Sequence, residues 1–215
     1  MAKETIKWTE AKLRLAFHLK ETQENSLSLA DWLDTGNAQF SAEDEAYFGK
    51  RRSSLRKNAK FWNEEELKMF FLSFILDAAG YVESEVFRTF LDRDLSDKVE
   101  NIALHVKPDC LLASGEGDEI QEPYFCFHEY KRSKRNADDP IAQVLLAMMI
   151  AQVKNKKPRT IYGCYIVGEL WYFMTIDSKE YSIASAIDAS TKPGFAQVIL
   201  VLRKLKMMLE KEFSK

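Results

Sequence analysis

The chain has 215 residues, a formal net charge of −2 and 46% hydrophobic residues. This length and composition suit one domain with a sizeable core, or a domain with a helical extension, and they exclude a disordered chain. The near balance of 31 basic and 33 acidic residues excludes a uniformly basic surface, so any contact with nucleic acid depends on local basic patches.

The cysteines and histidines do not form a disulfide or zinc pattern. Three cysteines are scattered through apolar runs, at positions 110, 126 and 164, and we expect them to be buried, reduced thiols. The three histidines lack the spacing of zinc ligands. The first residues have no apolar stretch typical of a signal peptide, and no run is long enough to span a membrane. We therefore expect a soluble, cytoplasmic protein.

Residues 1–62 are predicted to form a helical extension before the core. Apolar residues at helical spacing mark short helices, and Ser41 with Asp44 resembles a capping box that opens another. A basic run follows from Lys50 to Lys60. Such a run is most often a solvated helix face, and contact with phosphate is the less common interpretation.

The predicted core, residues 63–215, begins with the clearest helix of the chain. Asn63 is a favourable N-cap, and three glutamates occupy the first turn, where acids suit the helix dipole. An apolar stripe then continues at helical spacing until Gly80, which suits a left-handed C-terminal position.

Extended segments are predicted between residues 81 and 131. Alternating apolar and polar residues over 102–107 indicate one strand, Pro108 interrupts the pattern, and a second apolar strand follows. Residues 114–121 are rich in glycine and acids and are predicted to be a loop. Residues 124–130 are mostly aromatic and are predicted to form a further strand.

The last third of the core is predicted to contain a buried helix, a β-meander and an amphipathic helix. Asp139 before Pro140 is a strong helix start, and the segment that follows is apolar on almost every side, which is typical of a buried helix. Three apolar runs separated by short turns predict the meander. This order of elements indicates an α/β or α+β core with a helical N-terminal arm and a C-terminal helix.

The strand at residues 124–131 carries the clearest chemistry. Side chains alternate along a strand, so one predicted face carries Phe125, Phe127, Glu129 and Lys131. Charged residues that continue such a core-facing row are costly unless they are paired or coordinate something. Asp109 lies at the start of the preceding strand, and a turn between the two strands brings it next to Glu129 on one face of the sheet.

Two carboxylates beside an amine suit hydrolysis assisted by a divalent metal. Mg²⁺ prefers oxygen ligands and typically binds one or two carboxylates together with waters and substrate phosphate. Such a metal polarises the phosphoryl oxygen and makes a water more acidic. A nearby ammonium orients that water or stabilises charge at phosphorus. The sequence therefore predicts Mg²⁺, or Mn²⁺, at Asp109 and Glu129, with Lys131 close by.

Three features together resemble the PD-(D/E)xK nuclease superfamily: Pro108-Asp109, then Glu129-Tyr130-Lys131, then a buried helix that bears Gln143. The element order over residues 63–183 is similar to the αβββαβ core of that restriction-endonuclease-like superfamily, which implies a mixed central sheet. The resemblance implies that Asp109 and Glu129 are metal ligands, that Lys131 positions the water, and that Gln143 lines the site.

The chain also resembles an uncharacterised bacterial group related in this core to restriction-type endonucleases. The stretches that carry this second resemblance are Trp62–Lys68, Tyr124–Lys131, Ile161–Tyr165 and Trp171–Phe173. It implies a fold and a site more than a biological role.

The superfamily often adds an acid from the first core helix, and the candidates are Glu64, Glu65 and Glu66. Two structural explanations compete with that role. Acids at a helix start need no function, and Asn63 with Glu66 also fits a capping box. The sequence does not select one of the three.

Each site residue also has a purely structural interpretation. Glu129 and Lys131 form an ordinary exposed ion pair if they lie at a strand end, and Asp109 after proline suits a turn. Gln143, early in a helix, can bond a neighbouring backbone group. His128 is more often a satisfied strand histidine than a catalyst. The basic runs over 131–135 and 154–159 are expected to be solvated, although the first follows the predicted site directly.

The leading hypothesis is a Mg²⁺-dependent nuclease that hydrolyses phosphodiester bonds of DNA, as a restriction-like endonuclease. The alternative is a catalytically inactive nuclease-fold module that binds nucleic acid or a partner protein. A third interpretation makes the chain one subunit of a larger complex. The oligomeric state stays open, a homodimer included.

Overall fold

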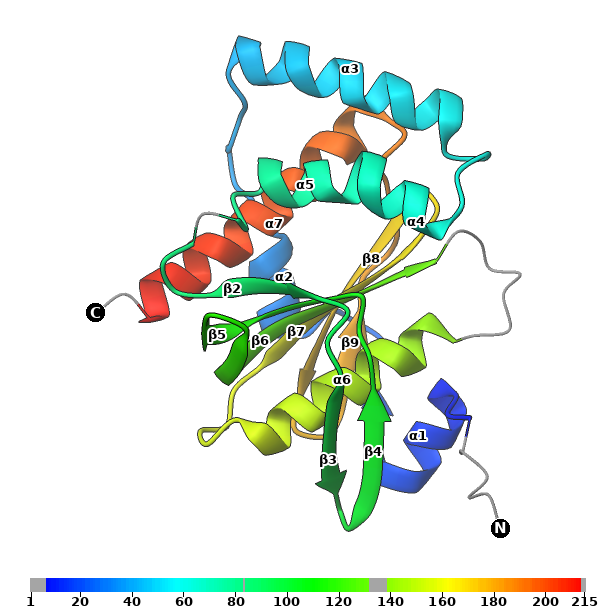
Figure 1. Ribbon diagram of the computed structural model, residues 1–215, viewed down its shortest axis with the longest axis vertical. Helices are drawn as coiled ribbons and strands as arrows, with labels where there is room; N and C mark the ends of the chain where they lie inside the picture. Colours follow the sequence, from blue (N-terminus) through cyan, green and yellow to red (C-terminus); the bar gives the residue numbers. More distant parts are fainter. Residues whose placement is uncertain (1–6, 83, 132–138, 214–215) are drawn as a thin grey trace.

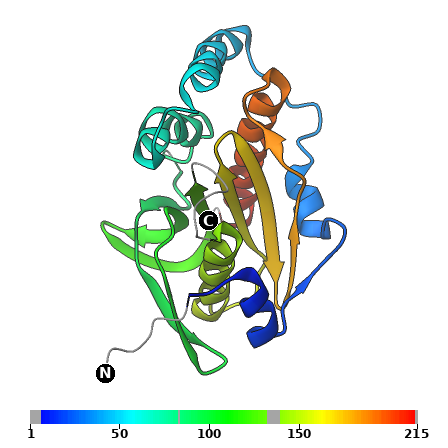
Figure 2. The same cartoon turned by 90° about the vertical axis from the view of Figure 1, so that its right-hand side faces the viewer.

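A mixed eight-stranded sheet crosses the molecule, with helices on both of its faces (Figures 1 and 2). This computed structural model describes residues 7–82, 84–131 and 139–213. The arrangement confirms the predicted α/β (α+β) class with a mixed central sheet.

The sheet and the helices have the following bounds. The strands of the sheet are β1 (Lys20–Glu21), β2 (Arg88–Leu91), β5 (Cys110–Glu116), β6 (Glu119–Lys131), β7 (Ile161–Val167), β8 (Leu170–Asp177), β9 (Glu180–Ile183) and β10 (Ile187–Asp188). A separate hairpin consists of β3 (Leu95–Val99) and β4 (Ile102–Val106). The helices are α1 (Glu10–Phe17), α2 (Leu27–Leu33), α3 (Ala42–Asn58), α4 (Glu64–Leu67), α5 (Ser73–Ala78), α6 (Pro140–Lys154) and α7 (Lys192–Phe213).

The strand order across the sheet is β1–β9–β8–β7–β6–β5–β2, with β10 paired to β8. Strands β2, β5 and β6 are antiparallel neighbours, and after α6 the chain returns as β7, parallel to β6. Helix, three strands, helix and strand therefore follow one another as the sequence predicts. The predicted meander is also confirmed, because β7, β8 and β9 pair antiparallel in succession.

The first core helix contains a π-helical turn. The segment Lys68–Leu72 is π-helical and separates α4 from α5. The Asn63 side chain accepts a hydrogen bond from the Glu66 backbone, and the Glu66 carboxylate accepts one from the Asn63 backbone. The capping box is therefore confirmed. Gly80 follows the helix with a φ of 74°, a left-handed conformation that glycine adopts without strain.

Two predicted segments differ from the structure. The predicted strand over 102–107 is β4, but it pairs with β3 in a hairpin outside the main sheet. That hairpin packs its apolar side chains against the α6 side of the core. The predicted loop over 114–121 is wrong, because β5 and β6 extend to a tight turn between Glu116 and Glu119. Gly117, with a φ of 58°, allows that short connection, so the glycine marks a hairpin turn.

A β-bulge in β6 changes the predicted alternation of side chains. Leu112 opposes Cys126, whereas Ala113 opposes Tyr124, which leaves Phe125 as the extra residue. Phe125 packs in the same cluster as Tyr130, and Tyr124 packs in the opposite cluster. The prediction that Phe125 shares a face with Glu129 is therefore wrong. The Phe127 side chain lies outside the described atoms.

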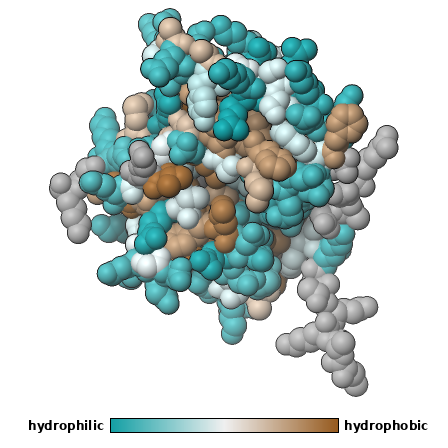
Figure 3. All heavy atoms as spheres, turned by 45° about the horizontal axis from the view of Figure 1, so that its top comes forward, coloured by the Kyte–Doolittle hydropathy of each residue, from teal (hydrophilic) through white to brown (hydrophobic). Residues whose placement is uncertain are grey.

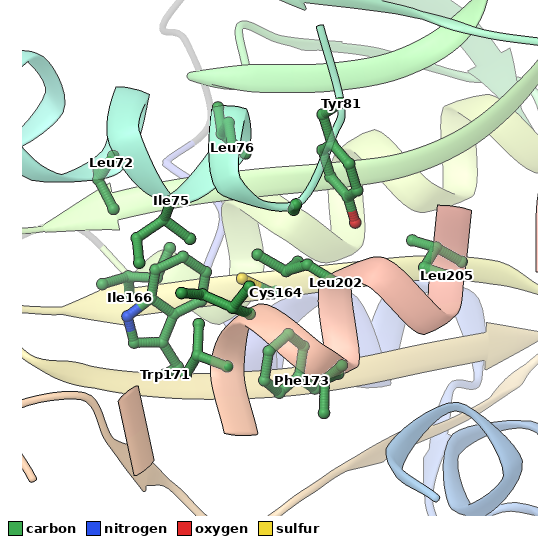
Figure 4. Packing of buried hydrophobic residues seen from close by; sticks show 14 of the residues in the cluster. Leu72, Ile75, Leu76, Tyr81, Cys164, Ile166, Trp171, Phe173, Leu202 and Leu205 are labelled. Carbon is green, nitrogen blue, oxygen red and sulfur yellow. The ribbon is translucent and has the colours of Figure 1, made fainter. Parts of the chain in front are cut away.

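Two apolar clusters fill the two sides of the sheet. One lies between the sheet and α2, α3, α5 and α7, and Figure 4 shows how α5 and α7 pack there over Cys164, Ile166 and Trp171. The other joins α1, α6 and the β3–β4 hairpin to the opposite face. Helix α6 is buried along most of its length, as predicted. Burial on both faces fixes which side chains of β5 and β6 point to which layer.

The segment over residues 20–33 packs directly on the core. Strand β1 pairs parallel with β9 at the edge of the sheet. The indole nitrogen of Trp32, in α2, donates a 2.8 Å hydrogen bond to the backbone oxygen of Val201 in α7. The predicted helices of the N-terminal extension are confirmed, and the division of the chain at residue 62 stays a prediction.

The described cysteines are buried free thiols, Cys110 and Cys164, as expected. The side chain of Cys126 lies outside the described atoms. Within the described ranges no helix has both the length and the apolar character needed to cross a membrane. On the face shown in Figure 3, hydrophilic side chains surround a smaller hydrophobic area.

Candidate functional site

Asp109 lies directly before β5 and Glu129 lies in β6, and both residues are buried. Cys110, the first residue of β5, opposes His128 in the antiparallel ladder with β6, so the residues that follow outward on the two segments, Asp109 and Glu129, come next to each other. Asp109 is 8% exposed and Glu129 is 2% exposed. Burial and the nearby charge of Asp109 raise the pKa of Glu129 to about 7. The sheet thus brings together the two acids that the sequence singled out.

Lys131 forms a buried ion pair with Glu129. Its Nζ lies 2.8 Å from Glu129 Oε1, and the residue is 9% exposed. Burial lowers the pKa of Lys131, but the hydrogen bond and the charge of Glu129 outweigh it, so the net pKa is raised and the amine stays charged. Glu129 Oε2 is buried and has no hydrogen-bond partner among the described residues. The exposed strand-end pair considered above is therefore not what the structure has.

The acid of the first core helix that lies nearest this pair is Glu64. Its Oε2 lies 4.0 Å from Lys131 Nζ, and its Oε1 lies 3.8 Å from Lys68 Nζ. Glu66 is engaged in the capping box, and the Glu65 side chain is 82% exposed. The geometry thus distinguishes three acids that the sequence left equivalent.

Lys68 also reaches the site, and the sequence reasoning missed it. Its Nζ lies 2.5 Å from Asp109 Oδ1. Burial lowers the pKa of Lys68, but the hydrogen bond and the charge of Asp109 outweigh it, so the net pKa is raised. A lysine in the first turns of a helix is ordinarily a surface residue. The only sequence signal was its position one helical turn after Glu64.

The Asp109 carboxylate is held by the backbone of β6. Its Oδ2 accepts a 2.8 Å hydrogen bond from the backbone nitrogen of Tyr130. A side chain fixed in this way has little freedom to turn towards solvent, so the interpretation of Asp109 as a simple turn residue does not account for its burial.

Gln143 lies on α6, one turn after its N-cap Asp139. Its amide oxygen is buried and has no hydrogen-bond partner among the described residues. No hydrogen bond joins it to Asp109, Glu129 or Lys131 in the described part of the chain. The local backbone bond considered for its oxygen is not present there, so this oxygen remains open to another group.

The donor set fits a divalent cation held by two carboxylates. In the described ranges, no three His, Cys, Asp or Glu side chains are grouped so that they could hold a metal ion. Mg²⁺ typically needs only one or two carboxylates, with water and substrate completing its coordination. The buried, unpartnered Glu129 Oε2 is the kind of polar atom that calls for an additional ligand. Asp109 and Glu129 are therefore the residues that would hold it.

The structure describes part of the predicted basic runs. The run from Lys50 to Lys60 lies on α3 and around its C-terminal end, and most of its basic side chains are exposed. The predicted run over 131–135 falls, beyond Lys131, outside the described residues.

His128 is fully buried, and its Nδ1 lies 3.2 Å from the Tyr130 hydroxyl, which fits a structural histidine.

Comparisons with known proteins give a distant match. No family model and no curated protein matches the chain. Among solved structures, the cryoEM structure of a DrdV–DNA complex matches at 15% sequence identity with a TM-score of 0.44. The match covers 76% of this chain and 14% of that chain. At this distance the match assigns no family.

Proposed function

We propose that this protein is a divalent-metal-dependent nuclease that hydrolyses phosphodiester bonds, with DNA as its expected substrate. The observation that carries the proposal is the buried group of Asp109, Glu129 and Lys131. Buried charges are costly, and a chain that keeps three together beside an unpartnered carboxylate oxygen has a site suited to a cation. DNA as the substrate follows from the PD-(D/E)xK resemblance.

Asp109 and Glu129 would hold the cation, which supplies positive charge that polarises the phosphodiester and makes water more acidic. Tyr130 holds the Asp109 carboxylate through its backbone nitrogen, at 2.8 Å, so this ligand is oriented before any substrate arrives. Such preorganisation lowers the cost of assembling the site.

Lys131 would act beside the reacting phosphate. Its ammonium is fixed on Glu129 Oε1 at 2.8 Å and stays charged. From that position it can hold the attacking water or stabilise negative charge that develops on the phosphate. The free amide oxygen of Gln143 would accept a hydrogen bond from a water at the site.

The experiment compares purified Asp109→Asn and Lys131→Met with the unaltered protein in Mg²⁺-dependent cleavage of duplex and single-stranded DNA. We expect each variant to lose at least about 100-fold in rate, because each removes a charge that acts in the transition state. Matched controls are Asp118→Asn and Lys192→Met, at side chains that are 95% and 70% exposed. Full activity in both site variants would disprove the proposal.

One observation favours the alternative, a nuclease-fold module that binds nucleic acid or a partner protein without cleaving. An ammonium group already lies on each acid, Lys68 on Asp109 and Lys131 on Glu129, so the site is largely neutralised without a cation. Calorimetric titration with Mn²⁺ separates the two functions. No metal affinity together with tight binding to DNA or to a protein would support the module.

A further inference from the structure

Lys68 occupies a place at the site that the proposed chemistry leaves unexplained. Its Nζ lies 2.5 Å from Asp109 Oδ1, 3.8 Å from Glu64 Oε1 and 3.5 Å from Glu65 Oε1. The side chain is 19% exposed. Lys131 already supplies the amine that the hydrolysis requires, so this second lysine needs its own account.

The ammonium of Lys68 lies on the oxygen of Asp109 that a cation would use. Asp109 Oδ2 is engaged by the backbone nitrogen of Tyr130, which leaves Oδ1 as the oxygen available to another ligand. Lys68 is bonded to that oxygen. A divalent cation bound through Asp109 Oδ1 and the Lys68 ammonium therefore cannot both occupy this position.

The charges around Asp109 also favour competition between Lys68 and a cation. When all three acids are ionised, Glu64, Asp109 and Glu129 carry three negative charges, and Lys68 and Lys131 carry two positive ones. The cluster thus has nearly its full complement of positive charge without a metal. While both amines stay in contact with the acids, their repulsion of an arriving divalent cation offsets much of the attraction that the carboxylates exert.

Lys68 also has a second partner to receive it. Glu65 lies 3.5 Å from its Nζ and is largely exposed, so an ammonium that leaves Asp109 still has an ion-pair partner.

The backbone at Lys68 is unusual as well. Lys68 begins the π-helical turn, in which its carbonyl accepts from the nitrogen of Ser73. Turns of this kind occur frequently at functional sites in α-helices.

We propose that Lys68 is a built-in competitor of the divalent cation. In the metal-free protein its ammonium holds Asp109 in place, and metal binding exchanges it for the cation while Lys68 turns towards Glu65. The inference rests on the proposed metal-dependent function. Its consequence is that the unaltered site binds metal more weakly than its carboxylates alone would allow.

The test is Mn²⁺ binding, measured by calorimetric titration without substrate, for the unaltered protein, Lys68→Met and Lys206→Met. Removal of the competitor should tighten Mn²⁺ binding roughly tenfold in Lys68→Met. Lys206→Met is the matched control, because Lys206 is similarly shielded and pairs with Glu210 at 3.6 Å away from the site. Its Mn²⁺ affinity should equal that of the unaltered protein.

Thermal unfolding with and without Mn²⁺ gives a second readout. Lys68→Met should gain more stability from Mn²⁺ than the unaltered protein does, since tighter binding adds more stabilisation at equal metal concentration. Lys68→Gln removes the charge but keeps a donor for Asp109, and it takes the place of Lys68→Met if that variant does not fold.

Unchanged or weaker Mn²⁺ binding in the folded Lys68 variant, with clear binding by the unaltered protein, overturns the role of Lys68 and leaves the nuclease proposal intact. Equal tightening in Lys206→Met also overturns it, because general charge would then be the cause. Absence of Mn²⁺ binding in both the unaltered protein and the Lys68 variants overturns both proposals together.

Discussion

The end of β6 has two faces, and buried titratable groups lie on both. On one face His128 and Tyr130 pack beside Cys110, with His128 at 6.2 Å ring to ring from Tyr81. On the other face Glu129 and Lys131 lie within 2.8 Å of each other. Adjacent residues of one strand thus belong to two different electrostatic environments.

Burial is the largest cause of the pKa shifts on the first face. It lowers the pKa of His128 to about 4 and raises the pKa of Cys110 to about 12. Burial also raises the pKa of Tyr130 well above its usual value. All three groups are therefore neutral near pH 7. A dry environment without opposite charges keeps titratable groups in their uncharged form.

The second face keeps its charges because opposite charges are brought together there. Lys68 lies on Asp109 and Lys131 lies on Glu129. Replacing such pairs by apolar residues often costs a protein nothing, so stability alone does not explain them. Burial by itself therefore does not distinguish the two faces, whereas retention of buried charge does.

The largest expected effect comes from removing the Lys131 amine from the charged face. Lys131→Met leaves Glu129 buried without its partner, and we expect the free energy of unfolding at pH 8 to fall by about 3–5 kcal/mol. Urea unfolding measures it. The double variant Glu129→Gln/Lys131→Met should recover part of the loss. Lys192→Met, at an exposed ion pair, should change stability little. Equal losses in Lys131→Met and Lys192→Met would contradict the larger role given to the buried ion pair.

The two faces should respond to pH with opposite signs. His128 has a pKa of about 4 in the folded protein and 6.5 ordinarily, so the unfolded chain takes up its proton first as pH falls. Its contribution is present above pH 6.5 and is lost towards pH 4, by up to about 3 kcal/mol. His128→Phe should flatten this acid-side loss in unfolding curves measured from pH 7 to pH 4. An unchanged curve would show that His128 does not stay neutral by burial.

The titration of Glu129 should change the free energy of unfolding with the opposite sign, over a similar pH range. Its pKa is about 7 in the folded protein and 4.5 ordinarily, so the folded protein keeps this proton while the unfolded chain has released it. The contribution is present below pH 4.5 and is lost as pH rises through 7. Glu129→Gln should remove this fall and gain stability above pH 7 relative to the unaltered protein. A steeper fall in the variant would contradict the assigned sign.

A smaller effect tests the packing of α6 on the charged face. A Cβ on Gly163 of β7 would lie 2.7 Å from Val144 Cγ1 and 2.9 Å from Met148 Sδ. Gly163→Ala should therefore cost about 1–3 kcal/mol through overpacking, measured by urea unfolding. Gly49→Ala is the control, since nothing lies within 4 Å of its added Cβ, and alanine there should be neutral or slightly stabilising. Equal stability of Gly163→Ala and Gly49→Ala would show that α6 can shift to accommodate the added Cβ at little cost.

The smallest expected effect tests the helix that delivers Glu64 and Lys68. Asn63→Ala removes the N-cap of α4 and should cost about 1 kcal/mol, read as a lower melting temperature. Ser41→Ala removes the equivalent cap of α3 and should cost a similar amount. Only Asn63→Ala should also change Mn²⁺ affinity, because α4, unlike α3, carries a residue that lies near the ion pair. An equal change of Mn²⁺ affinity in Asn63→Ala and Ser41→Ala would show that α4 has no special influence on the site.

Local patterns predicted much of this molecule. The cap at Asn63, the glycine turn at Gly80 and the buried helix after Pro140 each depend on neighbours in the chain, and each is confirmed. The approach of Asp109 to Glu129 was also predictable, because a turn between consecutive strands makes them neighbours.

What escaped prediction depends on contacts between distant residues. The extra residue Phe125 arises from how β6 pairs with β5, and an alternating sequence pattern contains no sign of a register shift. Lys68 has the composition of a surface helix position, and its partner Asp109 is remote in the chain. The β3–β4 hairpin leaves the sheet because its apolar side chains pack with α6.

The pairing of β1 with β9 bears on how much of the chain is needed for a well-behaved protein. Lys20 and Thr22 donate backbone hydrogen bonds to Lys179 and Tyr181. The two exposed, charged residues of β1 form a short edge strand, which disfavours pairing with the strands of other molecules. A protein that begins at residue 63 would present β9 as a bare edge, open to strands of other molecules. It would also lose Trp32 from its place against α7, so shortened versions should self-associate in solution.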